Sequence, residues 1–471
     1  MKLNNIDINS TLEALRQSLA TEKDMSPSLR ALIEVLMMVV QLLANRLGLN
    51  SQNSSKPPSS DINSLKSTRK SSGKKTGGQK GHLGSTLKRV DDPDEISLLP
   101  VDLRTLPKGH RYTDVGVEKR QVIDIEFCRI VTEYQAQILE NEQGKRYVAA
   151  FPKEVSKAVQ YGNNLKAHVV YLSQYQLLPY QRVAEYFSGQ LNIAISEGSI
   201  ANFNRQAFVH LATFSDIAKT KLCESARLHV DETGVNIKGQ RQWLHCASND
   251  YWTDFMAHPK RGVEAMENAN ILPRFTGVLC HDHWKPYYRF KDCKHALCNA
   301  HHLRELTRAY EQDKQQWAGR MKALLEIINR AVHQAGGVLN EIQNQRYKHY
   351  YHRLLKQADR ECPAPTHKEK GKRGRIKRSK ARNLLERLIN YEDDVLRFMT
   401  ERDAPFTNNQ GERDIRMTKV HQKISGCFRS EEGADIFCRV RGYLSTCRKQ
   451  GVNASHAMAL LFAGKLPDFI K

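Results

Sequence analysis

Apolar residues near the N-terminus repeat at the spacing of a coiled coil. Ser26 and Pro27 are typical of a helix start, and Gly48 is typical of a helix end. Between them leucine or valine recurs every three or four residues, at Leu29, Leu32, Leu36, Val39 and Leu43. The pattern predicts a helix with an apolar seam, after an earlier helix that carries Leu12, Leu15 and Leu19. The pattern favours self-association through residues 1–49 over packing within the chain. The preference is only slight, because three heptads are the minimum for predicting a coiled coil.

Residues 50–92 lose this pattern and become rich in Ser, Pro, Gly and Lys. So few apolar side chains cannot offset the entropy lost on ordering, which predicts a disordered linker. From Lys56 to Arg89, nine Lys or Arg face a single acid, Asp61. The linker is therefore a candidate to bind DNA, with a solvated tether as the alternative, and both descriptions can hold. Its candidate DNA contacts are Lys56, Arg69, Lys70, Lys74, Lys75 and Lys80.

Residues 93–152 carry the alternation of β-strands. The alternation is clearest from Ile123 to Phe127 and continues through 131–138, and 141–145 predicts a turn into a further strand. We therefore expect a small β-rich region here.

Residues 153–219 change to helical spacing. Within them, 180–187, a turn containing Gly189, and 196–208 resemble a helix-turn-helix. Helical hairpins of this shape also serve as plain scaffolding, so the two interpretations stand at even odds.

Residues 220–302 return to strand patterns. Four strands are predicted, with a helix at about 262–271 between the third and the fourth; the strands are 227–237, 242–248, 252–258 and 277–281. Three consecutive strands, a crossover helix and a fourth strand predict a mixed α/β sheet. Residues 303–400 are almost wholly helical and contain a second basic run, 368–382, where Arg373 and Arg375 are candidate DNA contacts. Helical patterns continue around Glu412 and in the C-terminal element, 441–471.

Composition narrows the partner class. The 471 residues include 73 Lys or Arg against 51 Asp or Glu, a formal charge of +22, which favours a nucleic-acid partner over a basic, solvated surface. Ten cysteines without a CxxC pair indicate reduced thiols. The first residues lack the order of a signal peptide, and the most apolar stretch, 35–43, is too short to span a bilayer. We expect a cytoplasmic, nucleoid-associated protein without membrane contact.

Two aspartates are candidate ligands for a hard divalent ion. Asp231 lies inside an apolar strand, where an unpaired carboxylate is costly to bury, and Asp282 follows the end of another strand. An aspartate at a strand end is more often a cap or turn residue. Glu412 is a third candidate because many cations follow it, although an ion pair with Arg416 would also explain it. The cations, which are candidate DNA contacts, are Arg413, Arg416, Lys419, Lys423 and Arg429.

Several short motifs, in this order, resemble the insertion sequence 66 family of transposases from about residue 28 to the C-terminus. They are NSQNSSKPPSSD at 50–61, GGQKGH at 77–82, HVDET at 229–233, NNQGER at 408–413 and SGCFRS at 425–430. The resemblance implies an Asp-Asp-Glu enzyme with an RNase-H-like catalytic domain, here 220–302 and 401–440. It also implies that Asp231, Asp282 and Glu412 bind Mg²⁺, and that 303–400 is a helical insertion before the last acid.

Cysteine content departs from this family. Its members usually carry cysteine pairs of zinc-finger spacing ahead of the segment that corresponds to 120–125, and only Cys128 is present here, so the zinc knuckle is expected to be lost. Cys298 and His301 resemble a Cys-x-x-His element of related transposases and are the alternative zinc ligands. Without a second cysteine pair, buried thiols and hydrogen-bonded histidines are favoured there over zinc.

The predicted activity is cutting and joining of insertion-sequence ends by Mg²⁺- or Mn²⁺-dependent phosphoryl transfer. The expected partners are double-stranded DNA, at the terminal repeats and the target, further copies of the chain, and element-encoded helper proteins. Two alternatives remain open: a stand-alone nuclease with a metal centre on His281, His283 and His301, and an inactive transposase-derived DNA-binding protein.

Overall fold

The computed structural model describes residues 2–3, 6–22, 24–47, 49–50, 53–54, 87–365, 376 and 378–470. Contacts group the chain into two units, Met1–Ser64 with Glu133–Lys471, and Leu65–Thr132, and each is described by itself.

The N-terminal elements are a two-stranded β-bridge and a helical hairpin. Their bounds are Lys2–Leu3 (β1), Ile6–Asp7 (β2), Ile8–Thr21 (α1) and Pro27–Leu47 (α2). Leu12 and Leu19 of α1 pack against Met37 of α2, so α2 turns one apolar side toward its partner helix. The predicted seam lies on another side of α2 and is exposed, with Leu36 at 62%. The helix therefore carries two apolar faces, of which the hairpin covers one.

Helix α2 also bears on the expectation of no membrane contact. The apolar stretch that we judged too short lies within this 21-residue helix, whose mean hydropathy of 1.6 is high enough for a membrane span by length and composition alone. One such helix near the N-terminus is weak evidence for a span, and the absence of membrane contact stays a prediction.

The β-rich region expected at 93–152 is largely absent. Its strands are limited to a hairpin of Ile138–Glu140 (β3) and Arg146–Val148 (β4), joined by the predicted turn at 141–145. The residues from Ile123 to Phe127 form no strand and are exposed. Alternation alone was a misleading signal here, because these side chains are exposed and a lone hairpin buries little apolar surface.

Four helices precede the sheet: Asn163–Val170 (α3), Tyr180–Leu191 (α4), Glu197–His210 (α5) and Ala212–Cys223 (α6). Helices α4 and α5 correspond to the predicted helix-turn-helix-like pair. The turn is displaced from Gly189, which lies inside α4, to Asn192, whose positive φ of 50° ends the helix. Ser196 then caps α5 by accepting a hydrogen bond from the Ser199 backbone.

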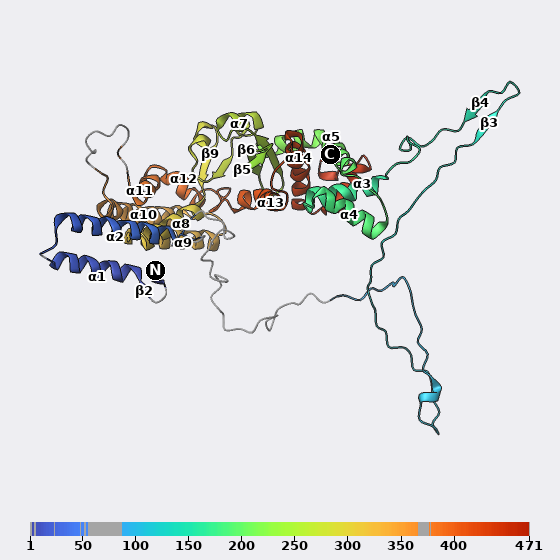
Figure 1. The fold of residues 1–471 in the computed structure, drawn as a ribbon, viewed down its shortest axis with the longest axis horizontal. Helices are drawn as coiled ribbons and strands as arrows, with labels where there is room; N and C mark the ends of the chain where they lie inside the picture. The colour runs from blue at the N-terminus through green and yellow to red at the C-terminus, as the bar shows by residue number, and fades with distance from the viewer. Residues whose placement is uncertain are drawn as a thin grey trace. The chain divides into compact units, whose positions relative to one another are not determined.

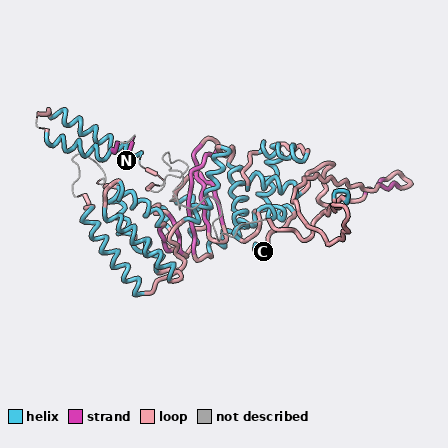
Figure 2. Tube along the Cα trace, turned by 90° about the horizontal axis from the view of Figure 1, so that it is seen from below, coloured by secondary structure: helices cyan, strands magenta, loops and turns pink. Residues whose placement is uncertain are grey.

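A five-stranded mixed sheet follows these helices, with helices on both sides of it (Figures 1 and 2). Its strands are Arg227–Ile237 (β5), Gln240–Ser248 (β6), Thr253–His258 (β7), Val278–His281 (β8) and Lys294–Leu297 (β9). The order is β7-β6-β5-β8-β9, with β5, β8 and β9 parallel to one another and β6 antiparallel to both of its neighbours. This topology is consistent with the predicted RNase-H-like core. The last strand, β9, is an addition to the four strands predicted.

Helices follow the sheet in two groups. Val263–Ala269 (α7) connects β7 to β8, close to the predicted crossover helix. Five helices lie between β9 and the next helix of the core and share a hydrophobic cluster of their own: Asn299–Glu311 (α8), Gln316–Gln334 (α9), Glu341–Glu361 (α10), Lys380–Asn390 (α11) and Glu392–Leu396 (α12). The chain ends with Asn409–Ser425 (α13), Glu431–Lys449 (α14) and Ala454–Phe462 (α15).

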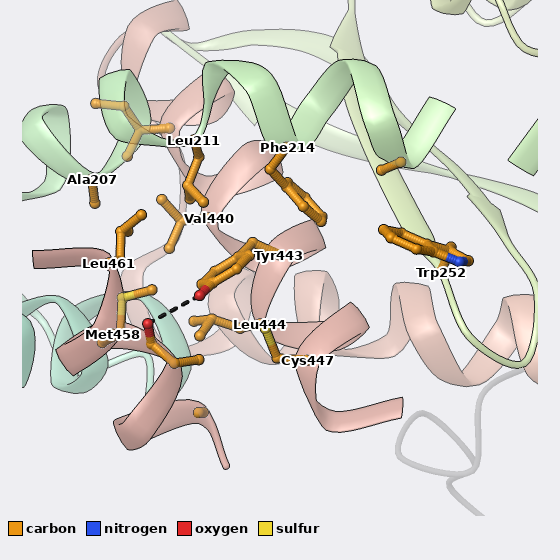
Figure 3. Close-up of a cluster of buried hydrophobic side chains, with 14 of the residues drawn as sticks. Ala207, Leu211, Phe214, Trp252, Val440, Tyr443, Leu444, Cys447, Met458 and Leu461 are labelled. Carbon is orange, nitrogen blue, oxygen red and sulfur yellow. Dashed lines mark hydrogen bonds between the residues drawn. The ribbon is translucent and has the colours of Figure 1, made fainter. Parts of the chain in front are cut away.

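The largest hydrophobic cluster joins the helices before the sheet to the last two helices (Figure 3). Phe214 of α6 packs edge-on against Tyr443 of α14, and the Tyr443 hydroxyl donates to the Ala457 carbonyl of α15 at 3.0 Å. Helix α14 thereby ties the helix-turn-helix-like region to the sheet.

Candidate functional site

Strand register places the two candidate aspartates side by side. His229 of β5 is opposite Cys280 of β8 in parallel pairing, so Asp231 and Asp282 each lie two residues farther along neighbouring strands. Because side chains alternate between faces, both aspartates lie on the face that carries His229, on strands about 4.8 Å apart. Asp282 follows the last residue of β8, and its carboxylate accepts a hydrogen bond from the Trp284 backbone at 2.9 Å.

Glu412 reaches this face from α13. Ile415, one turn after Glu412, packs with Val235 and Ile237, which share the face of Asp231 on β5. The Glu412 side chain is 28% exposed, and its Oε1 atom is buried without a hydrogen-bond partner. Three acids that are distant in the sequence therefore come from two strands and one helix to a common face.

Asn408 fixes the start of α13 against the sheet. Its side chain is buried, donates to the Val230 carbonyl at 2.7 Å and accepts from His229 Nδ1 at 2.9 Å. Its backbone N–H donates to Cys298 Sγ at 3.1 Å. Asn408 is the N-cap residue of α13, but its side chain makes no capping hydrogen bond and binds β5 instead.

The electrostatics of Asp231 reflect this crowding. Burial, and to a smaller extent the charges of Glu232, Asp282 and Glu412, together raise the pKa of its carboxyl from 3.8 to about 8. The Glu232 backbone N–H, at 2.9 Å, acts in the opposite direction. Such a carboxyl keeps its proton at neutral pH unless a cation replaces the proton.

Glu232, the neighbouring acid, belongs to the other face. It is almost fully buried, pairs with Arg261 at 2.6 Å and accepts a hydrogen bond from the Tyr287 hydroxyl. The Arg261 guanidinium lies over the rings of Trp243, at 4.8 Å, and Trp284, at 4.0 Å. This satisfied pair is a structural element, which separates the two acids of the HVDET motif by role.

Asp414, the next acid after Glu412, is also fully engaged. It pairs with Lys449 at 2.7 Å and accepts from Gln410 at 3.0 Å. Lys449 in turn donates to the carbonyls of Asn249 and Trp252. These contacts join α13 and α14 to the β6–β7 turn and leave Glu412 as the carboxylate of α13 that faces the aspartates.

A basic surface surrounds the start and the end of α13. Its five cations are all exposed: Arg413, Arg416, Lys419, Lys423 and Arg429. The ammonium of Lys419 donates at 3.2 Å to the carbonyl of Gly234, which lies on the strand that carries Asp231. The other candidate DNA contacts, Lys56, Arg69, Lys70, Lys74, Lys75, Lys80, Arg373 and Arg375, lie outside the described residues.

Two of the imidazoles near Asp282, those of His281 and His295, are hydrogen-bonded, whereas His283 Nε2 and His301 Nδ1 are buried without a hydrogen-bond partner. The His283 backbone donates to His281 Nδ1, His281 Nε2 donates to His295 Nδ1 at 3.1 Å, and His295 Nε2 donates to the Phe290 carbonyl. Both nitrogens of His281 are thus used internally, so a three-histidine centre with His283 and His301 is not assembled.

Three side chains form a different group. In the part of the chain that the structure describes, Cys298, His301 and Glu412 are the one set of three potential ligands whose donor atoms all lie within 4.8 Å of one another. Burial raises the pKa of the Cys298 thiol to about 11 and lowers the pKa of His301. Sequence reasoning had treated Glu412 separately from the other two. The missing signal is a tertiary contact: the Asn299 backbone donates to the Phe406 carbonyl and joins the start of α8 to the segment before α13.

Comparison with known proteins completes these observations. The model of the family described as "Transposase IS66 family" matches residues 158–436, more than half of the chain, and a second model, of a family of unknown function, matches residues 2–88. No curated protein matches the chain.

Proposed function

Because the chain belongs to the IS66 family of transposases, whose domain is of the DDE type, we propose that Asp231, Asp282 and Glu412 are its catalytic acids. Membership of the family implies DNA transposition. The observation that supports the choice of acids is their convergence: the charges of Asp282, 51 residues away in the sequence, and of Glu412, 181 residues away, both act on Asp231.

The donor set fits a hard divalent ion such as Mg²⁺ or Mn²⁺. Carboxylate oxygens are the ligands such ions prefer. Two features support the fit: like charges crowd Asp231, and Glu412 Oε1 is buried without a hydrogen-bond donor. A cation would relieve both. When bound, it would supply Lewis-acid activation of an oxygen nucleophile and neutralise charge on the phosphate.

The chain's own residues position the reaction. Asp231 and Asp282 are held by neighbouring strands, and Asn408 sets the place of Glu412 by fixing α13 to Val230. Water first attacks the phosphorus at the element end and displaces a 3′-hydroxyl. That hydroxyl then attacks a target phosphate, forming a new phosphodiester and releasing a target 3′-hydroxyl. Neither step needs a covalent enzyme intermediate, so alignment is the main contribution of the protein.

We assign DNA contacts to the basic surface of α13 and, by composition, to the linker 50–92 and the run 368–382. Phosphate contacts of this kind position the duplex without selecting its sequence. Sequence selection is assigned to 153–219, where α4 and α5 form the helix-turn-helix-like pair. The exposed seam of α2 is assigned to self-association, through a coiled coil within residues 1–49. Helper proteins encoded by the element remain expected partners.

The domain plan follows from these roles. Residues 220–302 and 401–440 form the catalytic domain, 303–400 the helical insertion and 441–471 a C-terminal helical element. Residues 93–152 occupy the place of the zinc knuckle without its cysteines.

A cleavage assay tests the acids directly. Full-length protein is incubated with Mg²⁺ and labelled duplexes carrying the element ends, and nicked and joined products are separated. Asp231→Asn and Glu412→Gln should remove both products and retain DNA binding. The matched controls are Asp393→Asn and Glu264→Gln, whose side chains are 83% and 54% exposed. Full activity of Glu412→Gln would refute the choice of third acid, and cleavage without joining would favour a nuclease.

A further inference from the structure

The group formed by Cys298, His301 and Glu412 differs in chemistry from the set of oxygen ligands beside it. It offers one sulfur, one imidazole nitrogen and one carboxylate oxygen, all within 4.8 Å of one another. Sulfur and nitrogen ligands select zinc and related ions, whereas Mg²⁺ prefers oxygen. Glu412 is the member that both sets share.

Local structure holds the three side chains in place before any ion binds. Cys298 is the residue before α8, and His301 lies in the first turn of that helix, three positions later. Glu412 lies in the first turn of α13. The two helix starts are joined by hydrogen bonds, from the Asn408 backbone to Cys298 Sγ at 3.1 Å and from the Asn299 backbone to the Phe406 carbonyl at 3.0 Å. The site is therefore largely preformed.

Two atoms of the group are buried without a hydrogen bond, His301 Nδ1 and Glu412 Oε1, and they lie 3.8 Å apart. Buried polar atoms are rarely left unpaired. Tetrahedral zinc with bonds of about 2.0–2.3 Å holds its ligand atoms about 3.3–3.8 Å from one another. The nitrogen–oxygen separation of 3.8 Å is a few tenths of an ångström wider than the spacing of about 3.3–3.5 Å that zinc sets for this pair, and side-chain movements of about 1 Å suffice to close the group.

Arg304 limits the strength of such a site. Its Nη2 atom lies 3.9 Å from Glu412 Oε1, too far for a hydrogen bond but close enough to oppose a cation. Three protein ligands also leave one tetrahedral position open. Both features favour an exchangeable ion over a permanent structural zinc.

We propose that Cys298, His301 and Glu412 form a site for a soft divalent ion such as Zn²⁺, and that an ion held there withdraws Glu412 from Asp231 and Asp282. The ion binds as the thiol of Cys298 releases its proton to solvent. Zinc then acts as an inhibitor of the transposase. The inhibition rests on the proposed catalytic role of Glu412, whereas the binding does not.

Binding is tested first, without reference to activity. Full-length protein is titrated with Co²⁺, whose bond to a thiolate gives a near-ultraviolet charge-transfer band, and Zn²⁺ is then added to displace it. We expect the band in the unmodified protein and its loss in Cys298→Ser. Cys223→Ser is the matched control, since Cys223 is partly buried and its thiol donates a hydrogen bond to the Ile271 carbonyl, away from Cys298, His301 and Glu412. An equal band in Cys298→Ser would overturn the proposal.

Inhibition is tested next, with Mg²⁺-supported cleavage of each variant as its own reference. Micromolar Zn²⁺ should inhibit the unmodified protein and Cys223→Ser, and Cys298→Ser should need at least tenfold more. Equal sensitivity of Cys298→Ser would mean that zinc acts on the aspartates and would overturn the proposed inhibition. Activity of Asp231→Asn would refute the catalytic assignment while leaving the Co²⁺ result intact, so the two failures are distinguishable.

Discussion

Replacing Asp231 by Asn should make the ion-free protein more stable at alkaline pH. The folded protein holds a proton on Asp231 up to about pH 8, whereas the unfolded chain releases it near pH 3.8. Between these values folding takes up a proton, so the free energy of unfolding falls as pH rises, by about 1.4 kcal/mol for each pH unit. From pH 5 to pH 8 the loss amounts to about 4 kcal/mol, and Asp231→Asn avoids it.

Thermal unfolding measures this difference. Three of the four tryptophans, Trp243, Trp252 and Trp284, belong to the sheet region, so their fluorescence reports the relevant transition. In EDTA, the midpoint of Asp231→Asn should rise relative to the unmodified protein by roughly 8 °C or more between pH 5 and pH 8. Added Mg²⁺ at pH 8 should stabilise the unmodified protein and leave the variant unchanged, because ligation replaces the proton.

The control is Asp393→Asn, an exposed acid on α12, which should follow the unmodified protein at every pH. Parallel pH profiles for the unmodified protein and Asp231→Asn would refute the electrostatic reasoning. An equal Mg²⁺ shift in both proteins would place the ion elsewhere.

Three further predictions concern the surroundings of the site. Asn408→Ala removes the hydrogen bonds to the Val230 carbonyl and the His229 ring, so it should lower the free energy of unfolding by about 2–3 kcal/mol and reduce cleavage. Asn390→Ala, the control, should do neither, and an unchanged thermal midpoint of Asn408→Ala would contradict the bridging role. Arg416→Ala should lower the magnitude of the slope of log affinity against log salt by about 0.9, for random and element duplexes alike, and Arg353→Ala on α10 is the control. An unchanged slope for Arg416→Ala would exclude a phosphate contact of this residue. Leu36→Lys on the exposed seam should dissociate oligomers in light scattering, whereas Glu34→Lys should not; equal masses for both variants would remove the seam from the interface.

Much of the sheet was predictable because its strands are long and apolar. The strand around Asp231 was located to the residue, 227–237, since its buried face continues over its whole length. Strand β9 was missed because four residues that begin with Lys294 and His295 carry too little pattern. The opposite error occurred at Ile123, where alternation was present but the side chain is 53% exposed. A pattern predicts a strand only where the fold supplies a surface to bury it.

The residues of the candidate site also differ in how far the sequence could predict them. Asp231 and Asp282 could be singled out from the sequence by their positions in and just after apolar strands, because an unpaired carboxylate is costly to bury there. Glu412 could be chosen only with the help of a family resemblance, since its own helix offers one other acid, Asp414, and several cations. His301 was singled out from the sequence, but its contact with Glu412, and that of Arg304, could not be predicted, because these contacts form between segments about 110 residues apart.

The path of the chain delays completion of the active site during synthesis. With Glu412 as the third acid, a ribosome that has translated both aspartates must add 130 more residues, including all of α8 to α12, before that acid exists. Until then the nascent chain carries two acids and the basic linker, so with the proposed roles of these residues it would bind DNA without cutting it. The same holds for every product truncated before Glu412. In a cell where translation occurs beside the gene, such fragments would occupy element ends as inert competitors of the full-length enzyme.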